Sequence, residues 1–151
     1  MSQVNQVART VQWFQKAKPM PSTDDIRVQA GCHFEEVGEM LAEMQGLCPT
    51  SQRAIQQARR AVNNLAGLLK DGVANFMVKN DVAYLDSLFD QYTTAIGVGH
   101  TMGYDMTAAI SEGNRSNFSK FDEKGDPIFH PNGKIAKSHL YVMPNFEPYV
   151  L

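Results

Sequence analysis

Residues 24–44 read DDIRVQAGCHFEEVGEMLAEM, and their pattern sets the fold class. Apolar side chains recur every three or four residues, which is the spacing of one buried face of an α-helix. These positions are Val28, Phe34, Val37, Met40, Leu41 and Met44. Residues 22–25, Ser-Thr-Asp-Asp, offer N-caps just before the pattern. The sequence therefore predicts a helix that begins there and runs to about Gly46.

The same periodicity predicts three more helices, over residues 3–17, about 49–69 and about 81–112. After residue 113 prolines and glycines are too frequent for another long helix. Asn132-Gly133 is the strongest turn signal in this segment and predicts one small β-hairpin. We therefore expect an all-α chain, with a four-helix body over residues 1–112 and a C-terminal arm over residues 113–151 that holds the hairpin. Body and arm form a single domain in this prediction.

Composition and charge narrow the class of protein. A chain of 151 residues suits one domain, and its formal net charge of −2 argues against nucleic acid or a membrane surface as a partner. No apolar run approaches the roughly 20 residues that a membrane span needs. The N-terminus lacks the pattern of a secretory signal. We expect a cytoplasmic protein, or one of the host cytoplasm if a phage encodes it.

Four glutamates on the second predicted helix form an acidic cluster: Glu35, Glu36, Glu39 and Glu43. On a helix they fall within an arc of about 100°, beside the apolar stripe. Like charges at these spacings repel by a few tenths of a kcal/mol per pair, and no Lys or Arg lies between Val28 and Gln52. The cluster is either a solvated acidic face or one that binds a cation.

An acidic pair on the fourth predicted helix favours the second alternative, a cation-binding site. Asp86 and Asp90 are four residues apart, share a helix face and border the apolar stripe of the fourth predicted helix. Gly97 falls on the same face and leaves room for a ligand. Two helices with carboxylates at their core edges can form an all-oxygen site, which selects Mg²⁺ or Mn²⁺ over Zn²⁺. Because Mg²⁺ in proteins commonly takes a substrate phosphate, phosphate chemistry is the leading class.

These motifs resemble those of the all-α nucleoside triphosphate pyrophosphohydrolases, the MazG/HisE-like group that includes the dimeric dUTPases. The group has E-E-x-x-E on one helix and E-x-x-D on a later one, and Glu35, Glu36 and Glu39 match the first motif. In the second, Asp90 matches the aspartate but Ser87 replaces the glutamate, for which Asp86 is the candidate substitute. Residues 114–121, NRSNFSKF, and 132–134, NGK, resemble the arm of bacterial and phage members.

The resemblance implies a MazG-like four-helix bundle and cleavage of a nucleoside triphosphate between its α and β phosphates, giving monophosphate and pyrophosphate. It implies that Glu35 is the general base and that Mg²⁺, or Mn²⁺ in its place, is bound by Glu36, Glu39, Asp86 and Asp90. Substrate contacts are expected from Asn117, Lys120, Lys134 and Trp13. Some phage members act on dGTP, which makes dGTP the favoured substrate. Family members assemble from several copies, so a homodimer or homotetramer is expected.

Two other functions remain open at this point. A non-catalytic helical module could bind a basic partner through its acidic face, without any metal. A metal-dependent phosphatase would release inorganic phosphate instead of pyrophosphate. The identity of the products distinguishes all three.

Overall fold

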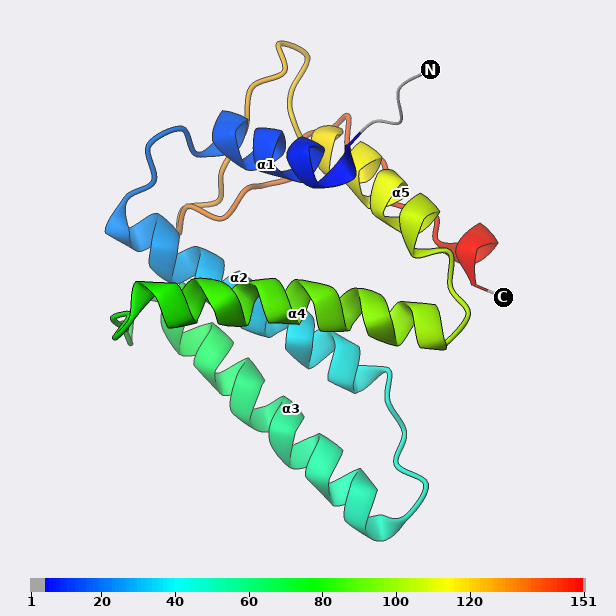
Figure 1. Cartoon of the computed structure of the whole chain (residues 1–151). Helices are drawn as coiled ribbons and strands as arrows, with labels where there is room; N and C mark the ends of the chain where they lie inside the picture. The colour runs from blue at the N-terminus through cyan, green and yellow to red at the C-terminus, as the bar shows by residue number, and fades with distance from the viewer. Residues whose placement is uncertain (1–4, 151) are drawn as a thin grey trace. The chain divides into compact units, whose positions relative to one another are not determined.

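The computed structural model describes residues 5–150, and these residues form five α-helices and no strand (Figure 1). The helices are α1 (Gln6–Ala17), α2 (Thr23–Ala42), α3 (Pro49–Lys70), α4 (Asp81–Thr101) and α5 (Met106–Phe118), followed by the short 3₁₀ helix η1 (Glu147–Tyr149). The all-α prediction is confirmed, whereas the four-helix bundle and the β-hairpin arm are not. Residues 1–4 and 151, which the predictions included, lie outside the described residues.

Most of these helices are capped at their N-terminus by a side chain that accepts a hydrogen bond from the first turn. Ser22 caps α2 in a reciprocal capping box with Asp25. Asn5, Asn80 and Asp105 each accept a hydrogen bond from the backbone N–H three residues on, at the start of α1, α4 and α5. The starts of α1 and α4 therefore follow from local sequence.

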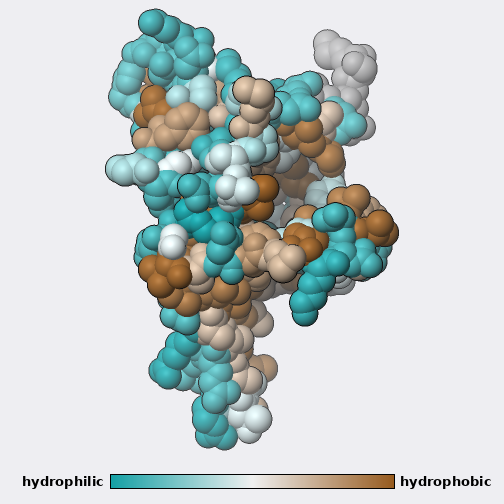
Figure 2. All heavy atoms as spheres, turned by 90° about the vertical axis from the view of Figure 1, so that its left-hand side faces the viewer, coloured by the Kyte–Doolittle hydropathy of each residue, from teal (hydrophilic) through white to brown (hydrophobic). Residues whose placement is uncertain are grey.

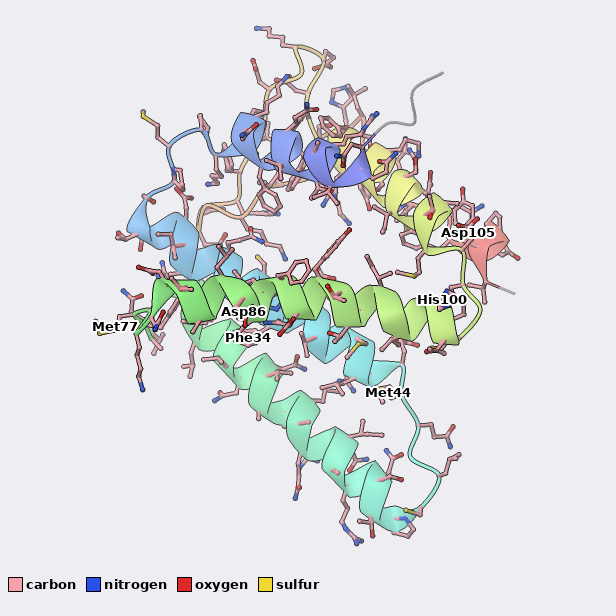
Figure 3. The ribbon with its side chains drawn as sticks, in the orientation of Figure 1. Phe34, Met44, Met77, Asp86, His100 and Asp105 are labelled. Atoms are coloured by element: carbon pink, nitrogen blue, oxygen red, sulfur yellow. The ribbon has the colours of Figure 1, made fainter. Side chains whose placement is uncertain are left out.

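The prediction of one helix over residues 81–112 is wrong. Gly103 has a φ of 82°, in the left-handed region that favours glycine, and it ends α4 after Thr101. Asp105 then caps a new helix, α5, which continues past residue 112 to Phe118. Figure 3 shows His100 near the end of α4 and Asp105 at the start of α5. The glycine acts as a helix terminator here, so five helices replace the expected four.

The predicted hairpin is a turn without strands. Gly133 has a φ of 83°, and the backbone N–H of His130 donates to the carbonyl of Lys134 at 2.8 Å. The N–H of Ala136 also donates to the carbonyl of Ile128 at 2.8 Å, but Pro127 before this segment and Pro131 within the turn have no backbone N–H with which to extend a ladder. The turn lies where it was predicted, but it is not the expected two-residue turn: three residues separate the paired His130 and Lys134, and only Gly133 among them has a positive φ.

The described chain divides into two compact units, each of which is described by itself. The first, here called the hairpin unit, contains Met20–Phe76 and Phe129–Lys134. The second, here called the terminal unit, contains residues 5–19, 77–128 and 135–150.

In the hairpin unit α2 and α3 run antiparallel and pack along their length (Figure 1). Glycines on α2 permit the close approach, since a Cβ on Gly31 would lie 2.7 Å from the Cγ of Lys70 and 3.0 Å from the carbonyl oxygen of Ala66. Gly38 lies against Asn63 in the same way. This approach places the middle of α2 beside the C-terminal end of α3.

Replacing Gly31 by Ala is expected to destabilise the fold despite the better helix propensity of alanine. The crowding costs about 1–3 kcal/mol, more than the roughly 1 kcal/mol gained in propensity. Gly67 of α3 is the matched control, because a Cβ there meets nothing within 4 Å. Chemical denaturation should show a lower free energy of unfolding for Gly31→Ala and a higher one for Gly67→Ala. Equal effects of the two substitutions would contradict the close packing of α2 against α3.

The terminal unit has a small core of Trp13, Ala17 and Phe121, with Phe118 and Ile135 packed against it. Polar contacts join α1 to α5. The buried side chain of Asn114 donates to the backbone carbonyl of Gln6 at 3.0 Å and accepts from the hydroxyl of Thr10 at 2.9 Å.

An ion pair within α5, between Glu112 and Arg115, also accepts a hydrogen bond from the C-terminal segment. Glu112 accepts hydrogen bonds from Arg115 and from the backbone N–H of Asn145, both at 2.8 Å or less. The hydrogen bond from Arg115, supported by the one from Asn145, holds the pKa of Glu112 at about 2, well below the ordinary 4.5.

The lowered pKa of Glu112 predicts a pH-dependent contribution to stability. Because this pKa is depressed in the folded state, the contribution is complete above pH 4.5 and is lost as the pH falls toward 2. Glu112→Gln should lack this contribution. Thermal melts of both proteins between pH 2 and 6 should show a difference in melting temperature that is largest above pH 4.5 and closes near pH 2; a constant difference would contradict the ion pair.

The N-terminal two-thirds of α4 is exposed. Every residue from 81 to 95 is exposed. Apolar residues are among them, including Val82 at 80% exposure, Leu85 at 68% and Phe89 at 62%. Contiguous exposed apolar side chains in such number are uncommon on one helix of a soluble chain.

Candidate active site

Glu35 lies on α2 between two lysines that come from different segments of the hairpin unit. The ammonium of Lys70, the last residue of α3, lies 2.5 Å from Oε1 of Glu35. The ammonium of Lys134, in the turn, lies 2.7 Å from Oε2. The side chain of Glu35 is only 27% exposed, so both ion pairs form in a partly desolvated environment. Segments about 35 and 99 positions away in sequence thus meet at one side chain.

The lysines determine the protonation state of Glu35. Partial burial by itself raises the pKa of this carboxyl, but the hydrogen bonds from Lys134 and Lys70 outweigh it, and the pKa lies below 4.5. The same hydrogen bond raises the pKa of Lys134 above 10.5. Glu35 is therefore a carboxylate, and Lys134 an ammonium, at neutral pH.

The other glutamates of the cluster are free of ion pairs. Glu36, Glu39 and Glu43 are exposed on α2, and none of their side chains has a hydrogen bond or ion pair with any described residue. The cluster thus has two parts: one carboxylate bound by lysines, and three carboxylates open to a cation.

The predicted aspartates lie on α4, in the terminal unit, and Asp86 is marked in its N-terminal half in Figure 3. Asp86 and Asp90 are both exposed, and their carboxylates have no partner among the described residues. Ser87, which stands at the glutamate position of the family motif, donates its hydroxyl to the carbonyl of Ala83 at 2.9 Å. A Cβ on Gly97 would meet nothing within 4 Å, in line with the predicted open face.

The donor set fits Mg²⁺ in its chemistry. All four expected ligands are carboxylates that are exposed and unpaired, and oxygen donors are those that Mg²⁺ prefers. Each helix supplies two of them. Within residues 5–150 no group of three or more His, Cys, Asp or Glu side chains lies close enough to hold an ion by itself. The four-ligand site stays a prediction.

Three of the four predicted substrate contacts lie together in the terminal unit. The ammonium of Lys120 donates to the side-chain oxygen of Asn117 at 2.8 Å and lies 5.4 Å from the ring of Trp13. The indole N–H of Trp13 donates to the carbonyl of Asn117, also at 2.8 Å. Trp13 is only 6% exposed and stacks on Phe121, which makes it part of the core of this unit. The fourth contact, Lys134, lies in the hairpin unit beside Glu35.

Sequence reasoning missed Lys70. It lies at the end of α3, where a terminal lysine is ordinarily a solvated charge that complements the helix dipole. Its partner Glu35 is on another helix, and the pairing depends on the antiparallel packing of α2 and α3. No local signal could have identified it.

Comparisons of the chain with protein-family models, with curated proteins and with solved structures gave no significant match. The resemblance therefore depends on the quoted motifs alone. No helix among the described residues combines the length and apolar character needed to cross a membrane.

Proposed function

We propose that the protein is a Mg²⁺-dependent nucleoside triphosphate pyrophosphohydrolase that cleaves the α–β phosphoanhydride and acts on the nucleotide pool of the cytoplasm. One observation supports this most directly: two lysines meet a carboxylate beside further carboxylates that have no partner. Lysines bind phosphate, and free carboxylates bind the divalent cation that accompanies it. A magnesium–nucleotide complex needs both kinds of group. The motif resemblance favours dGTP as the first substrate.

In this proposal Glu36, Glu39, Asp86 and Asp90 hold Mg²⁺, which when bound screens the phosphate charges from an incoming nucleophile. Lys70 and Lys134 exchange the carboxylate of Glu35 for the phosphate oxygens of the substrate. Glu35, released from its lysines, accepts a proton from the attacking water. The water oxygen bonds to the α-phosphorus, the bond from that phosphorus to the α–β bridging oxygen breaks, and pyrophosphate leaves.

Incubation with Mg²⁺ and each common dNTP and NTP, followed by chromatography of the products, tests the activity. We expect monophosphate and pyrophosphate, with turnover lost on addition of EDTA. Diphosphate and inorganic phosphate would replace the proposal by a phosphatase. Absence of turnover with both Mg²⁺ and Mn²⁺ would favour the second candidate, a helical module that binds a basic partner through the unpaired Glu36, Glu39 and Glu43.

A homodimer or homotetramer is the second part of the proposal. The exposed apolar side chains of α4 support it, because a second copy that covers this helix would remove them from water. We expect light scattering to give a multiple of the 16.8 kDa chain mass.

Leu85→Asp is expected to reduce the assembly to a single chain, since a charge in an apolar interface has no partner. Ser87→Asp is the matched control, because Ser87 is exposed on the same helix away from the apolar stripe. Light scattering of both variants, with circular dichroism to verify folding, measures the difference. A monomeric wild-type protein, or equal behaviour of the two variants, would count against assembly through α4.

A further inference from the structure

The exposed surface of α3 is rich in arginine and amide side chains. At helical spacing it presents Arg53, Gln56, Gln57, Arg59, Arg60, Asn63 and Asn64. All seven are exposed, and Asn63, at the edge of this surface, also lies against Gly38 of α2. Figure 2 shows hydrophilic side chains along one side of the lower end of the view, where the N-terminal part of α3 lies. We call these seven residues the arginine face.

No described acidic side chain forms an ion pair with the arginines of this face. The sequence has no Asp or Glu from residue 44 to residue 70, although the whole chain carries 16 of them. The guanidinium groups of Arg53, Arg59 and Arg60 have no hydrogen bond or ion pair with any described residue. The net charge of −2 thus conceals a segregated positive surface.

Four side chains lie next to one another in the middle of the arginine face. They are Gln56, Arg59, Arg60 and Asn63, at positions i, i+3, i+4 and i+7 of one helix. Two neighbouring guanidinium groups and two amides can both bind an anion and exchange hydrogen bonds with a polar planar edge.

The chemistry of this face favours nucleic acid over other anionic partners. Interfacial membrane helices place Trp or Phe on their apolar side, but α3 contains no aromatic residue, and its apolar side packs against α2. Protein interfaces have apolar or aromatic anchors at their centre, which this face lacks. Arg, Gln and Asn are the side chains that bind phosphates and read base edges.

The dimensions of α3 favour double-stranded DNA over double-stranded RNA as the partner. Its 22 residues make a rod about 33 Å long, with one side free of other helices of its unit. The major groove of B-form DNA admits an α-helix, whereas the major groove of duplex RNA is too narrow. We propose that the arginine face of α3 binds double-stranded DNA, with the arginines on phosphates and the amides at base edges.

This inference does not depend on the pyrophosphohydrolase activity and is tested without it. Fluorescence anisotropy of a labelled 20-base-pair duplex measures binding by the whole protein in EDTA, from 50 to 200 mM NaCl. Three phosphate contacts predict a slope of log K against log salt of about −3, which is a loss of roughly 40-fold over this range. Arg59→Gln/Arg60→Gln should weaken binding at least 10-fold at 50 mM and reduce the slope by about 2.

Lys79→Gln/Lys124→Gln is the matched control. It removes the same charge from exposed lysines outside α3 and should leave affinity within about 2-fold. Circular dichroism verifies folding, and Arg53→Gln, with an expected slope change of about 1, replaces the double variant if that variant is unfolded. The proposal is overturned by absence of binding at 50 mM salt or by equal losses in the arginine and lysine variants. Binding of duplex RNA, single-stranded DNA, polyglutamate or phosphatidylserine vesicles as tight as that of duplex DNA would overturn it too.

Discussion

Glu36→Gln is expected to abolish turnover of nucleoside triphosphates while leaving the fold intact. The substitution keeps the size of the side chain but removes the negative charge with which an exposed carboxylate binds Mg²⁺. Losing one group that stabilises developing phosphate charge reduces kcat on the order of 10²–10³-fold. Release of pyrophosphate at saturating Mg²⁺ measures the loss. Unchanged circular dichroism and thermal melting are expected, because the exposed side chain has no hydrogen bond or ion pair with a described residue.

Glu43→Gln is the control for this experiment. Glu43 follows α2 directly, is exposed and unpaired like Glu36, and belongs to the same acidic cluster, but it lies outside the family motif. Its replacement should leave kcat within about 2-fold, the ordinary range for a change remote from the reaction. If Glu36→Gln retains full activity, the metal assignment fails. If both variants lose activity equally, the reaction depends on the total negative charge of the α2 face. A defined set of metal ligands is then excluded.

Lys70→Met is expected to lower kcat/KM by about 10- to 100-fold, mostly through KM. This range corresponds to the loss of one charge-assisted hydrogen bond to a phosphate oxygen. Lys79→Met is the control, since Lys79 is exposed and has no ion pair with a described residue. Steady-state kinetics that separate kcat from KM, and inhibition constants for pyrophosphate, give the result. A loss confined to stability, with KM and pyrophosphate inhibition unchanged, would make Lys70 a structural partner of Glu35 alone.

The same variant has an effect on protonation that does not depend on turnover. Two ammonium groups hold the pKa of Glu35 below 4.5. Removing the ammonium of Lys70 takes away one of the two hydrogen bonds, so the pKa of Glu35 should rise toward its ordinary value. Because the base acts as a carboxylate, the acidic limb of the pH–rate profile should move to higher pH. NMR titration of labelled Glu35 measures the shift, and an unchanged pKa would contradict the ion pair with Lys70.

The two helices of the hairpin unit, α2 and α3, were the elements that the sequence predicted most accurately. The apolar stripe of residues 28–44, the capping residues 22–25 and Pro49 at the start of α3 predicted both helices within a few residues. These signals are local, because each concerns a backbone group or a side chain within one or two turns. The break between α4 and α5 was missed, although Gly103 was noted, because a glycine within an apolar pattern fits both a weakened helix and a terminated one.

Some features of the candidate site follow from local sequence, and others depend on residues that are distant in the chain. The chemistry of the acidic cluster follows from sequence, because residues three and four apart on a helix must share a face. The sequence does not predict that Glu35 alone among these glutamates forms ion pairs. Its partners, Lys70 and Lys134, are far away in the chain. The position of Trp13 in the core of the terminal unit likewise depends on Phe121, more than a hundred residues later.

Sequence periodicity, caps and turn residues thus sufficed for the helical class, for most helix starts and for the kind of chemistry on α2, because these depend on short-range sterics and spacing. The partners of Glu35, the exposed state of α4 and the unpaired arginine face of α3 arise from how helices pack. Packing depends on the shape and charge of surfaces that meet across the chain, such as the small Gly31 against the stem of Lys70. That information resides in pairs of distant residues, and no single segment contains it.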